Sequence, residues 1–207
     1  MSIIIEKPVF SSLTDSSLVE WTRQALPGDH RAYRELILRH QSMVLTNCRC
    51  LTGLDHDSED LAQEVFIKAY FGLGRFEERA QFKTWVQRIK VNHCLNHIRS
   101  QKGRSFSSIE AEDEDQESLR SSIPREALTR DSHEAAIEAK SDVDRALRAL
   151  PDDYRIPLIL CDLDGYSYQE AADELGIGMS ALKMRVKRGR NFFRVAYRSL
   201  VEDMAGS

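Results

Sequence analysis

The side chains with the clearest chemical capability lie in one basic segment near the C-terminal end of the chain. Between residues 183 and 198 there are seven Lys or Arg side chains and no acidic one. They are Lys183, Arg185, Lys187, Arg188, Arg190, Arg194 and Arg198. Clustered cations of this kind neutralise the phosphates of nucleic acids. Apolar residues recur in the same segment every three or four positions, which predicts a helix with one buried side. These apolar residues are Leu182, Val186, Phe193 and Leu200.

A shorter helix is predicted immediately before the basic one. Ser167 and Glu170 have the spacing of a capping box, and Gly176 and Gly178 mark a turn between the two helices. Ser180 is expected to cap the basic helix. This order is typical of a helix-turn-helix, whose second helix enters the major groove of duplex DNA. For the charge run alone, the alternatives are a solvated helix face or a surface for an acidic protein.

The N-terminal half of the chain is expected to be helical throughout. After a loose tail at 1–14, apolar spacing predicts helices from Asp15 to Leu26, from the cap Asp29 to Thr52, from the cap Asp57 to the glycines at 72 and 74, and over 82–101. No segment alternates apolar and polar residues as a strand would. These elements predict an all-α first domain at 15–104.

A second helical domain is expected at 140–207, after an acidic linker at 105–139. Six of the eight residues from 110 to 117 are acidic, and a segment so poor in apolar residues cannot fold alone. In the second domain, Ser141 and Asp144 are expected to cap a helix that Pro151 ends, and another helix runs from Asp152 to about Leu163. The fold class predicted for the whole chain is therefore all-α, with two small domains.

The net charge of −4 hides a division of the charge into blocks. Residues 75–104 carry eight basic and two acidic side chains, whereas 105–144 carry four basic and twelve acidic ones.

The four cysteines have no CxxC spacing and lie in apolar helical patterns, which favours buried thiols. His93, Cys94 and His97 share about one helical turn, but no fourth ligand lies nearby, so no metal is expected. No membrane span or cleavage signal is found, and a cytoplasmic protein is expected.

Three blocks of this sequence, in this order, resemble the extracytoplasmic-function (ECF) group of bacterial sigma factors. The block from Asp57 to Tyr70 is similar to that family's polymerase-binding helix. The block from Phe82 to His93 looks like its −10 recognition block. Ala149–Arg155 and Gly165–Ala172 together resemble its −35 domain. The resemblance covers about residues 15–100 and 140–200.

On the first block, four acidic or amide side chains lie opposite the apolar stripe of the predicted helix: Glu59, Asp60, Gln63 and Glu64. Such a face suits a basic protein surface. The resemblance implies that this surface is the coiled coil of the beta-prime clamp of core RNA polymerase, and that the polymerase beta flap is a second contact. Without the resemblance, a solvated helix face would be an equally good interpretation.

The second block is expected to contact the −10 element. Its cations Lys83, Arg88, Lys90, Arg99 and Lys102 can meet phosphates. With the resemblance, the loop from Arg75 to Gln81, which includes Phe76, is expected to form with Asn92 a pocket for a base pulled from the stack. Opening a duplex without ATP needs captured bases, and Asn offers both a donor and an acceptor to a base edge. A core role is favoured for Trp85 and stays open for Phe76.

On the recognition helix, Lys183, Met184 and Lys187 match the family's base-facing positions, and Ser180 is a further expected −35 contact. Arg185, Arg188 and Arg190 are interpreted as phosphate or structural contacts. The chain departs from the family here, because Ser180-Ala181-Leu182 stands where Gly-Thr-Val is frequent. The family's −35 specificity is therefore not carried over.

These features predict a sigma initiation factor that binds core RNA polymerase, directs it to promoter DNA through −10 and −35 elements and assists melting. An anti-sigma factor is a further expected partner. The alternative is a helix-turn-helix regulator that is not a polymerase subunit. No P-loop, HExxH or GxSxG motif is present, so neither enzyme activity nor a cofactor is expected.

The acidic linker is expected to occupy a basic groove of the polymerase. The alternatives are that it folds back onto the basic helices of the free protein or that it is only a solvated tether.

Overall fold

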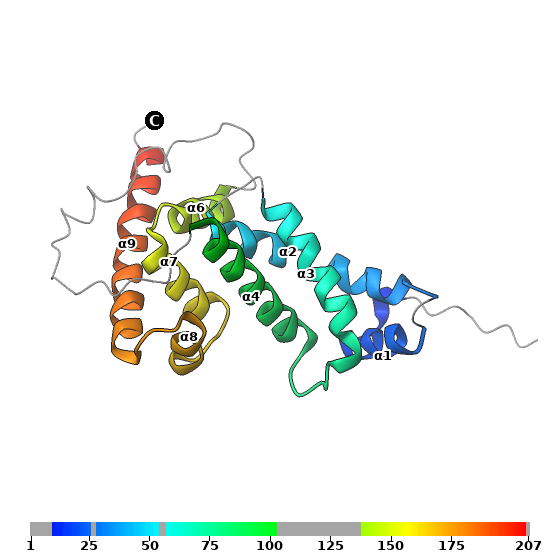
Figure 1. Cartoon of the computed structure of the whole chain (residues 1–207). Helices are drawn as coiled ribbons and strands as arrows, with labels where there is room; N and C mark the ends of the chain where they lie inside the picture. The colour runs from blue at the N-terminus through cyan, green and yellow to red at the C-terminus, as the bar shows by residue number, and fades with distance from the viewer. Residues whose placement is uncertain (1–9, 26–27, 54–56, 103–137, 206–207) are drawn as a thin grey trace, which may run out of the picture. The chain divides into compact units, whose positions relative to one another are not determined.

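The computed structural model describes residues 10–25, 28–53, 57–102 and 138–205 (Figure 1). Nearly all of the predicted acidic linker and most of the N-terminal tail lie outside these residues. Within the described ranges every regular element is a helix and none is a strand. The all-α prediction is therefore confirmed.

The chain divides into two compact units. The first comprises residues 1–48 and 56–94, and the second comprises residues 49–55 and 95–207. The last residues of the helices at Arg31–Thr52 and Phe82–Lys102 belong to the second unit. Each unit has its own core.

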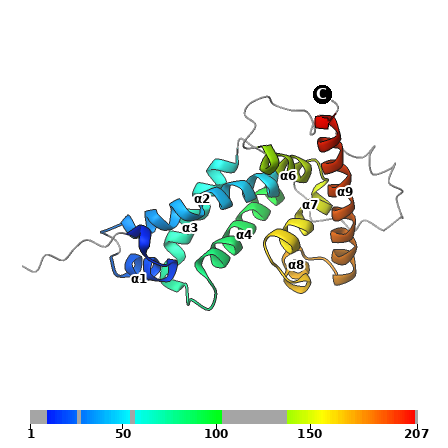
Figure 2. The same cartoon turned by 180° about the vertical axis from the view of Figure 1, so that it is seen from behind.

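The described residues of the first unit form four helices and two short 3-10 turns. They are η1 (Phe10–Ser12), α1 (Asp15–Ala25), α2 (Arg31–Thr52), α3 (Ser58–Gly72), η2 (Leu73–Arg75) and α4 (Phe82–Lys102), the last residues of α2 and α4 excepted. In both views α2, α3 and α4 lie side by side (Figures 1 and 2). The hydroxyl of Tyr33 on α2 donates to the carbonyl of Phe66 on α3, and the buried thiols of Cys48 and Cys94 join α2 to α4 with their Sγ atoms 3.6 Å apart.

Part of the predicted loose tail is folded. The guanidinium of Arg39 on α2 donates to the carbonyls of Phe10, Ser11 and Leu13 and forms an ion pair with Asp15 at 3.0 Å. These bonds hold η1 against the start of α2. The sequence prediction missed them because Arg39 lies more than twenty positions away along the chain.

The second unit holds the C-terminal helices α6 (Glu138–Arg148), α7 (Asp152–Leu158), the π-helix η4 (Ile159–Leu163), α8 (Tyr168–Leu175) and α9 (Met179–Ala205). Helix α9 packs against α6, α7 and α8. Its buried side comprises Leu182, Val186, Phe192, Ala196 and Leu200.

The close approach of α7 and α9 depends on Gly189. A Cβ atom at this position would lie 2.7 Å from the carbonyl oxygen of Tyr154 and 3.2 Å from the Cβ of Leu158. Both of these groups are in or beside the backbone of α7 and cannot swing away. The ring of Tyr154 stacks on Phe192 at 5.0 Å between centroids, which fixes α7 on the same side of α9.

Several helix boundaries differ by a few residues from the sequence predictions. Helix α9 begins at Met179, so Ser180 lies in its first turn and is not the cap. Asp57 precedes α3 but its side chain makes no capping hydrogen bond. Helix α6 begins at Glu138, so Ser141 and Asp144 lie inside it. Of the two neighbouring phenylalanines, Phe192 is buried, whereas the prediction chose its neighbour.

Candidate nucleic-acid interface

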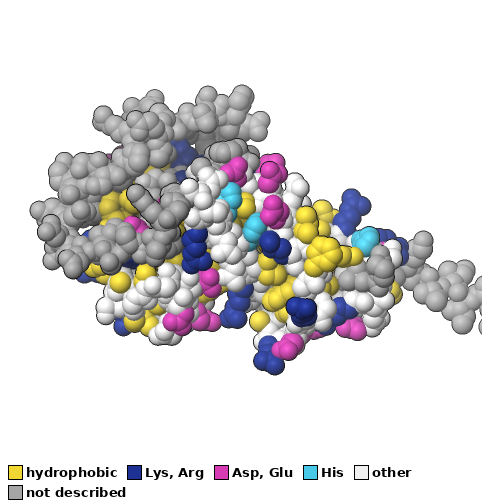
Figure 3. Space-filling model, in the orientation of Figure 1, with side chains coloured by type: hydrophobic (Ala, Val, Ile, Leu, Met, Phe, Trp, Pro, Cys, Tyr) yellow, Lys and Arg dark blue, Asp and Glu magenta, His cyan; other side chains and the backbone are white. Residues whose placement is uncertain are grey.

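The polar face of α3 is formed as the apolar spacing predicts. Its buried side consists of Leu61, Ala62, Val65, Phe66 and Ala69. Its predicted polymerase-binding residues are all exposed: Glu59, Asp60, Gln63 and Glu64. Figure 3 shows acidic side chains gathered over α3. The structure therefore presents the four side chains on one helix, at the surface.

Glu64 also takes part in a contact between two helices. Its Oε2 lies 3.0 Å from Nε2 of His93 on α4, a side chain that is mostly buried. The contact fixes one end of the acidic face relative to α4. It leaves Asp60, one helical turn earlier, exposed to solvent.

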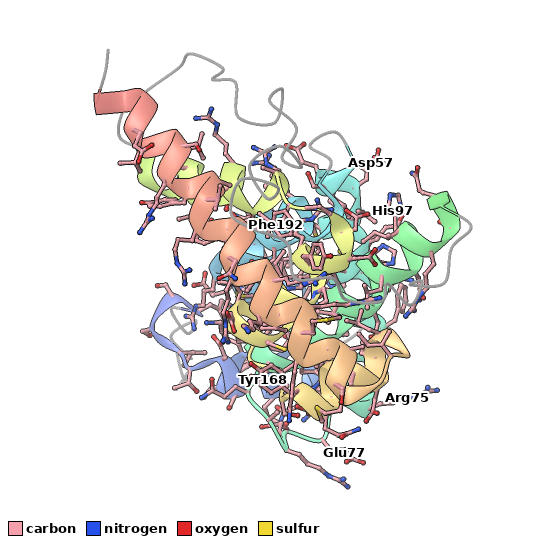
Figure 4. All side chains as sticks on the ribbon, turned by 90° about the vertical axis from the view of Figure 1, so that its left-hand side faces the viewer. Asp57, Arg75, Glu77, His97, Tyr168 and Phe192 are labelled. Carbon is pink, nitrogen blue, oxygen red and sulfur yellow. The ribbon has the colours of Figure 1, made fainter. Side chains whose placement is uncertain are left out.

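A cavity of about 340 Å³ lies beside the loop that follows α3. Its lining comprises Ser16 and Val19 from α1, Phe76, Glu78, Arg79, Ala80 and Gln81 from the loop, and Phe82 from the start of α4. Asn92 is not part of this lining, so the structure does not bring together the whole pocket that the sequence predicted. Arg75 and Glu77 extend outward from the same loop (Figure 4) and are exposed.

The wall of the cavity rests on an aromatic cluster. The ring of Phe76 is buried and stacks on Trp85 with centroids 4.7 Å apart, and Phe82 meets both rings edge-on or tilted. A Cβ atom on Gly72 would lie 3.2 Å from the Trp85 ring, so this glycine admits the indole. Phe76 is therefore both a core residue and a cavity wall.

The cations predicted for the −10 element have different surroundings. Lys83, Arg88 and Asn92 are exposed on α4. The side chain of Lys90 is fully buried, so the prediction that it meets a phosphate does not fit its position. Arg99 lies in the second unit, where its Nη2 donates to the carbonyl of Glu174 at 2.9 Å.

The first helix of the helix-turn-helix, α8, begins with the capping box that the sequence predicts. Ser167 accepts a hydrogen bond from the Glu170 amide, and the Glu170 carboxylate accepts one from the Ser167 amide, so the capping box is confirmed. Gly176 ends α8 with φ of 67°, a left-handed conformation that glycine adopts without a steric penalty. The turn directs the chain into α9.

Helix α9 presents one continuous polar stripe. At 100° per residue, its members fall within about a third of the helix circumference. The exposed ones are Ser180, Lys183, Lys187, Arg190, Arg194 and Arg198, and Met184 is half-buried beside them. This stripe lies opposite the buried side and can face a polyanion.

Three of the predicted −35 contacts make contacts within the protein instead of, or in addition to, lying at the surface. Arg185, interpreted from the sequence as a phosphate or a structural contact, is buried and lies 3.6 Å from Asp153 on α7, a position that fits the structural alternative and not a contact with DNA. Arg190 is half-exposed and donates from Nε and Nη2 to the two carboxylate oxygens of Asp162, both at 2.8 Å. Hydrogen bonding to Asp162 raises the pKa of Arg190. Arg188 is half-buried and donates to the Tyr154 hydroxyl at 3.4 Å.

Two protein-family models match this chain over the segments that hold these surfaces. Sigma-70 region 2 matches residues 36–104, and Sigma-70, region 4 matches residues 140–192. The ECF RNA polymerase sigma-E factor of Escherichia coli is 33% identical over 181 residues, which are 86% of this chain and 91% of that protein.

The chain belongs to the ECF sigma factors. It is a sigma initiation factor, and this family is not a family of enzymes. The RNA polymerase sigma-H factor of Pseudomonas aeruginosa is 31% identical over 91% of this chain and 96% of its own length. The ECF RNA polymerase sigma factor SigW of Bacillus subtilis is 28% identical over 86% of this chain and 95% of its own length.

Two solved structures share the fold of this sigma factor. One is the sigma factor RpoE of Bartonella quintana in complex with the anti-sigma factor NepR, with a TM-score of 0.52 and 22% identity over 80% of this chain and 96% of that one. The other is CnrH in complex with the cytosolic domain of CnrY, with a TM-score of 0.52 and 22% identity over 89% of this chain and 97% of that one. Within the described residues, no helix of the sigma factor is long and apolar enough to cross a membrane.

The sequence prediction missed the contribution of α1 to the cavity. Ser16 and Val19 line it, yet α1 precedes the residues that match Sigma-70 region 2. The apolar spacing of α1 indicated only a helix with a buried side. Contacts between residues more than fifty positions apart carry no local signal in the sequence.

Proposed function

We propose that this sigma factor binds core RNA polymerase through α3, captures an unstacked −10 base beside the loop at 75–81, and reads the −35 element with α9. The observation that carries the most weight is the cavity of about 340 Å³ between that loop and α1. Its volume lies at the lower end of the roughly 300–1,000 Å³ typical of small-ligand pockets. It adjoins exposed cations on the loop and on α4. Such cations can hold the phosphates on either side of a base that enters the cavity.

The polymerase contact is assigned to Glu59, Asp60, Gln63 and Glu64. These side chains form an acidic and amide face on a rigid helix, and such a face complements a basic partner. By family resemblance the partner is the coiled coil of the beta-prime clamp. The beta flap is proposed as a contact of the C-terminal domain.

The −10 element is assigned to the loop, the cavity and the exposed residues of α4. Arg75, Lys83 and Arg88 would hold the backbone of the strand, because exposed cations neutralise phosphates. A base that enters the cavity would meet the ring of Phe76 and the polar groups of Arg79 and Gln81. Stacking and hydrogen bonds of this kind offset the stacking lost on opening the duplex. Asn92 is retained as a contact outside the cavity.

The −35 element is assigned to the stripe on α9. Ser180, Lys183, Met184 and Lys187 occupy the first turns, which enter the major groove in a helix-turn-helix. The cations further along the stripe would hold phosphates, and Arg190 would exchange Asp162 for a phosphate or share its donors between the two.

The domains proposed for these roles are residues 15–104 and 140–207. The sigma factor carries out no reaction of its own, because the polymerase does the chemistry, and it acts in the cytoplasm, where that enzyme transcribes. An anti-sigma factor is proposed as a further partner, since both structural neighbours were solved with one or with the cytosolic domain of a partner protein.

A run-off transcription assay tests the proposal. Core polymerase, the purified sigma factor and a library of promoter fragments are combined, and the transcripts are sequenced. We expect transcripts that begin downstream of one shared pair of elements and only when the sigma factor is present. DNA binding without any core-dependent transcript would favour the helix-turn-helix regulator instead.

A further inference from the structure

Arg23, a half-buried residue of α1, makes hydrogen bonds with three positions between Leu73 in η2 and Glu78 in the loop that follows. Its Nε donates to the carbonyl of Leu73 at 3.2 Å, its Nη2 donates to the carbonyl of Phe76, and its Nη1 donates to Oε1 of Glu78 at 2.7 Å. The guanidinium carbon also lies 5.8 Å from the centroid of the Phe76 ring. One planar side chain thus holds three positions of η2 and the loop at once, which the single ammonium of a lysine cannot do.

The third of these positions has a restricted backbone. Glu78 has φ of 55°, and among the described residues it is the one non-glycine residue with a positive φ. A side chain with a Cβ atom is disfavoured in this left-handed region, so the surroundings must hold it there. The ion pair from Arg23 to the Glu78 carboxylate supplies such a restraint.

The conformation of Glu78 determines where the next residues go. Arg79, Ala80 and Gln81 follow it directly, and all three line the cavity together with Phe76 and Glu78. A change of φ at Glu78 would redirect this part of the wall. Arg23 itself is not in the lining, so it acts on the cavity through the loop.

The ion pair also balances the negative charge of the Glu78 carboxylate in the cavity wall. Glu78 lines a cavity that we assign to a nucleic acid strand, and an unbalanced carboxylate there would repel phosphates. Arg23 sits 2.7 Å from this carboxylate and compensates for it.

We propose that Arg23 is a positioning residue that shapes the base-capture cavity, and that α1 is therefore part of the promoter-opening machinery. This inference rests on the proposed function of the cavity. It assigns a role to a helix that precedes the residues matched by Sigma-70 region 2.

The test compares Arg23→Ala and Arg23→Lys with wild type in the holoenzyme formed with core polymerase. The exposed residue Arg34 on α2 supplies the matched control, Arg34→Ala. Base preference is measured on fork-junction DNA that varies in the −10 element, and opening is measured by permanganate reactivity of unpaired thymines. Holoenzyme assembly and thermal unfolding are measured in parallel.

We expect Arg23→Ala to slow opening by up to about a hundredfold, the cost of a misplacement of about 1 Å, and to flatten the −10 base preference. Assembly and unfolding temperature should stay close to those of Arg34→Ala. Arg23→Lys keeps the charge but loses the fork, so it should flatten the base preference too. If Arg23→Ala does not fold, Arg23→Lys decides the question.

A second variant separates this inference from the proposed function. Ala80→Trp fills the cavity directly, so it should abolish the −10 preference if the cavity receives a base. If Ala80→Trp has this effect while both Arg23 variants keep wild-type preference, the role of Arg23 is wrong and the cavity assignment stands. If neither position affects −10 preference, both are wrong. Equal losses of assembly, stability and opening in the Arg23 variants would show a purely structural role and overturn the inference.

Discussion

Truncation of two neighbouring cations on α9 should separate stability from promoter reading. Arg185 is 2% exposed and paired with Asp153, whereas Lys187, two residues later, is exposed on the polar stripe. Arg185→Ala removes one partner of a largely buried ion pair, and such losses cost about 3–5 kcal/mol. Because Asp153 is partly exposed and can regain water, we expect a cost near the lower end, about 3 kcal/mol.

Lys187→Ala should behave in the opposite way. An exposed side chain contributes little to folding, so the free energy of unfolding should change by less than about 0.5 kcal/mol. If Lys187 contacts a base edge, its loss should reduce discrimination at one position of the −35 element by about 1–3 kcal/mol.

Two measurements on the full chain check this pair of expectations. Urea unfolding followed by circular dichroism gives the free energy of unfolding, and selection from a duplex library with a randomised −35 element gives base preference. Arg185→Ala should be unstable but should keep wild-type preference in the fraction that folds. The reasoning is refuted if Arg185→Ala is as stable as wild type and changes base preference, because α9 would then face DNA with the side that we describe as buried.

Three further predictions follow from other parts of the structure. The double reversal Asp60→Lys and Glu64→Lys should weaken binding to core polymerase without unfolding α3, and unchanged affinity in a fluorescence titration would remove this face from the interface. Gly189→Ala should destabilise the second unit by roughly 1–3 kcal/mol, because the new Cβ would lie 2.7 Å from a carbonyl oxygen of α7; wild-type unfolding in urea would contradict this. Burial raises the pKa of the Cys161 thiol to about 11 and that of Cys50 to about 12, so the native protein should react slowly with a thiol reagent at pH 8 and all four thiols should react after unfolding. Folding raises both thiol pKa values, so the folded protein favours the neutral thiols. The free energy of unfolding should therefore keep its full value below the thiol pKa of the unfolded chain and should fall as the pH rises toward 11 and 12.

The parts of the fold that depend on local patterns could be predicted from the sequence. The capping box of Ser167 and Glu170, the left-handed Gly176 and the buried side of α3 all follow from spacing over a few residues. The burial of Arg185 fits the structural alternative given for it, because it follows Leu182 by three residues and directly precedes Val186, both of which are buried.

Other features could not be predicted because they depend on contacts between distant segments. The choice between Phe192 and its neighbour depends on the phase of a long helix, which drifts slightly from the ideal period, and on the ring of Tyr154. The burial of Lys90 depends on the helices packed around α4. The cavity requires α1 to meet a loop more than fifty residues later, and the bonds of Arg23 that shape it have no signature in the sequence.

Permanganate footprinting of a promoter selected in the run-off assay tests the central claim most directly. With core polymerase and this sigma factor together, we predict reactive, unpaired thymines in the −10 element, and none with either component alone. If the complex binds the same promoter but every thymine there stays unreactive, the protein does not open DNA and the account of its cavity is contradicted.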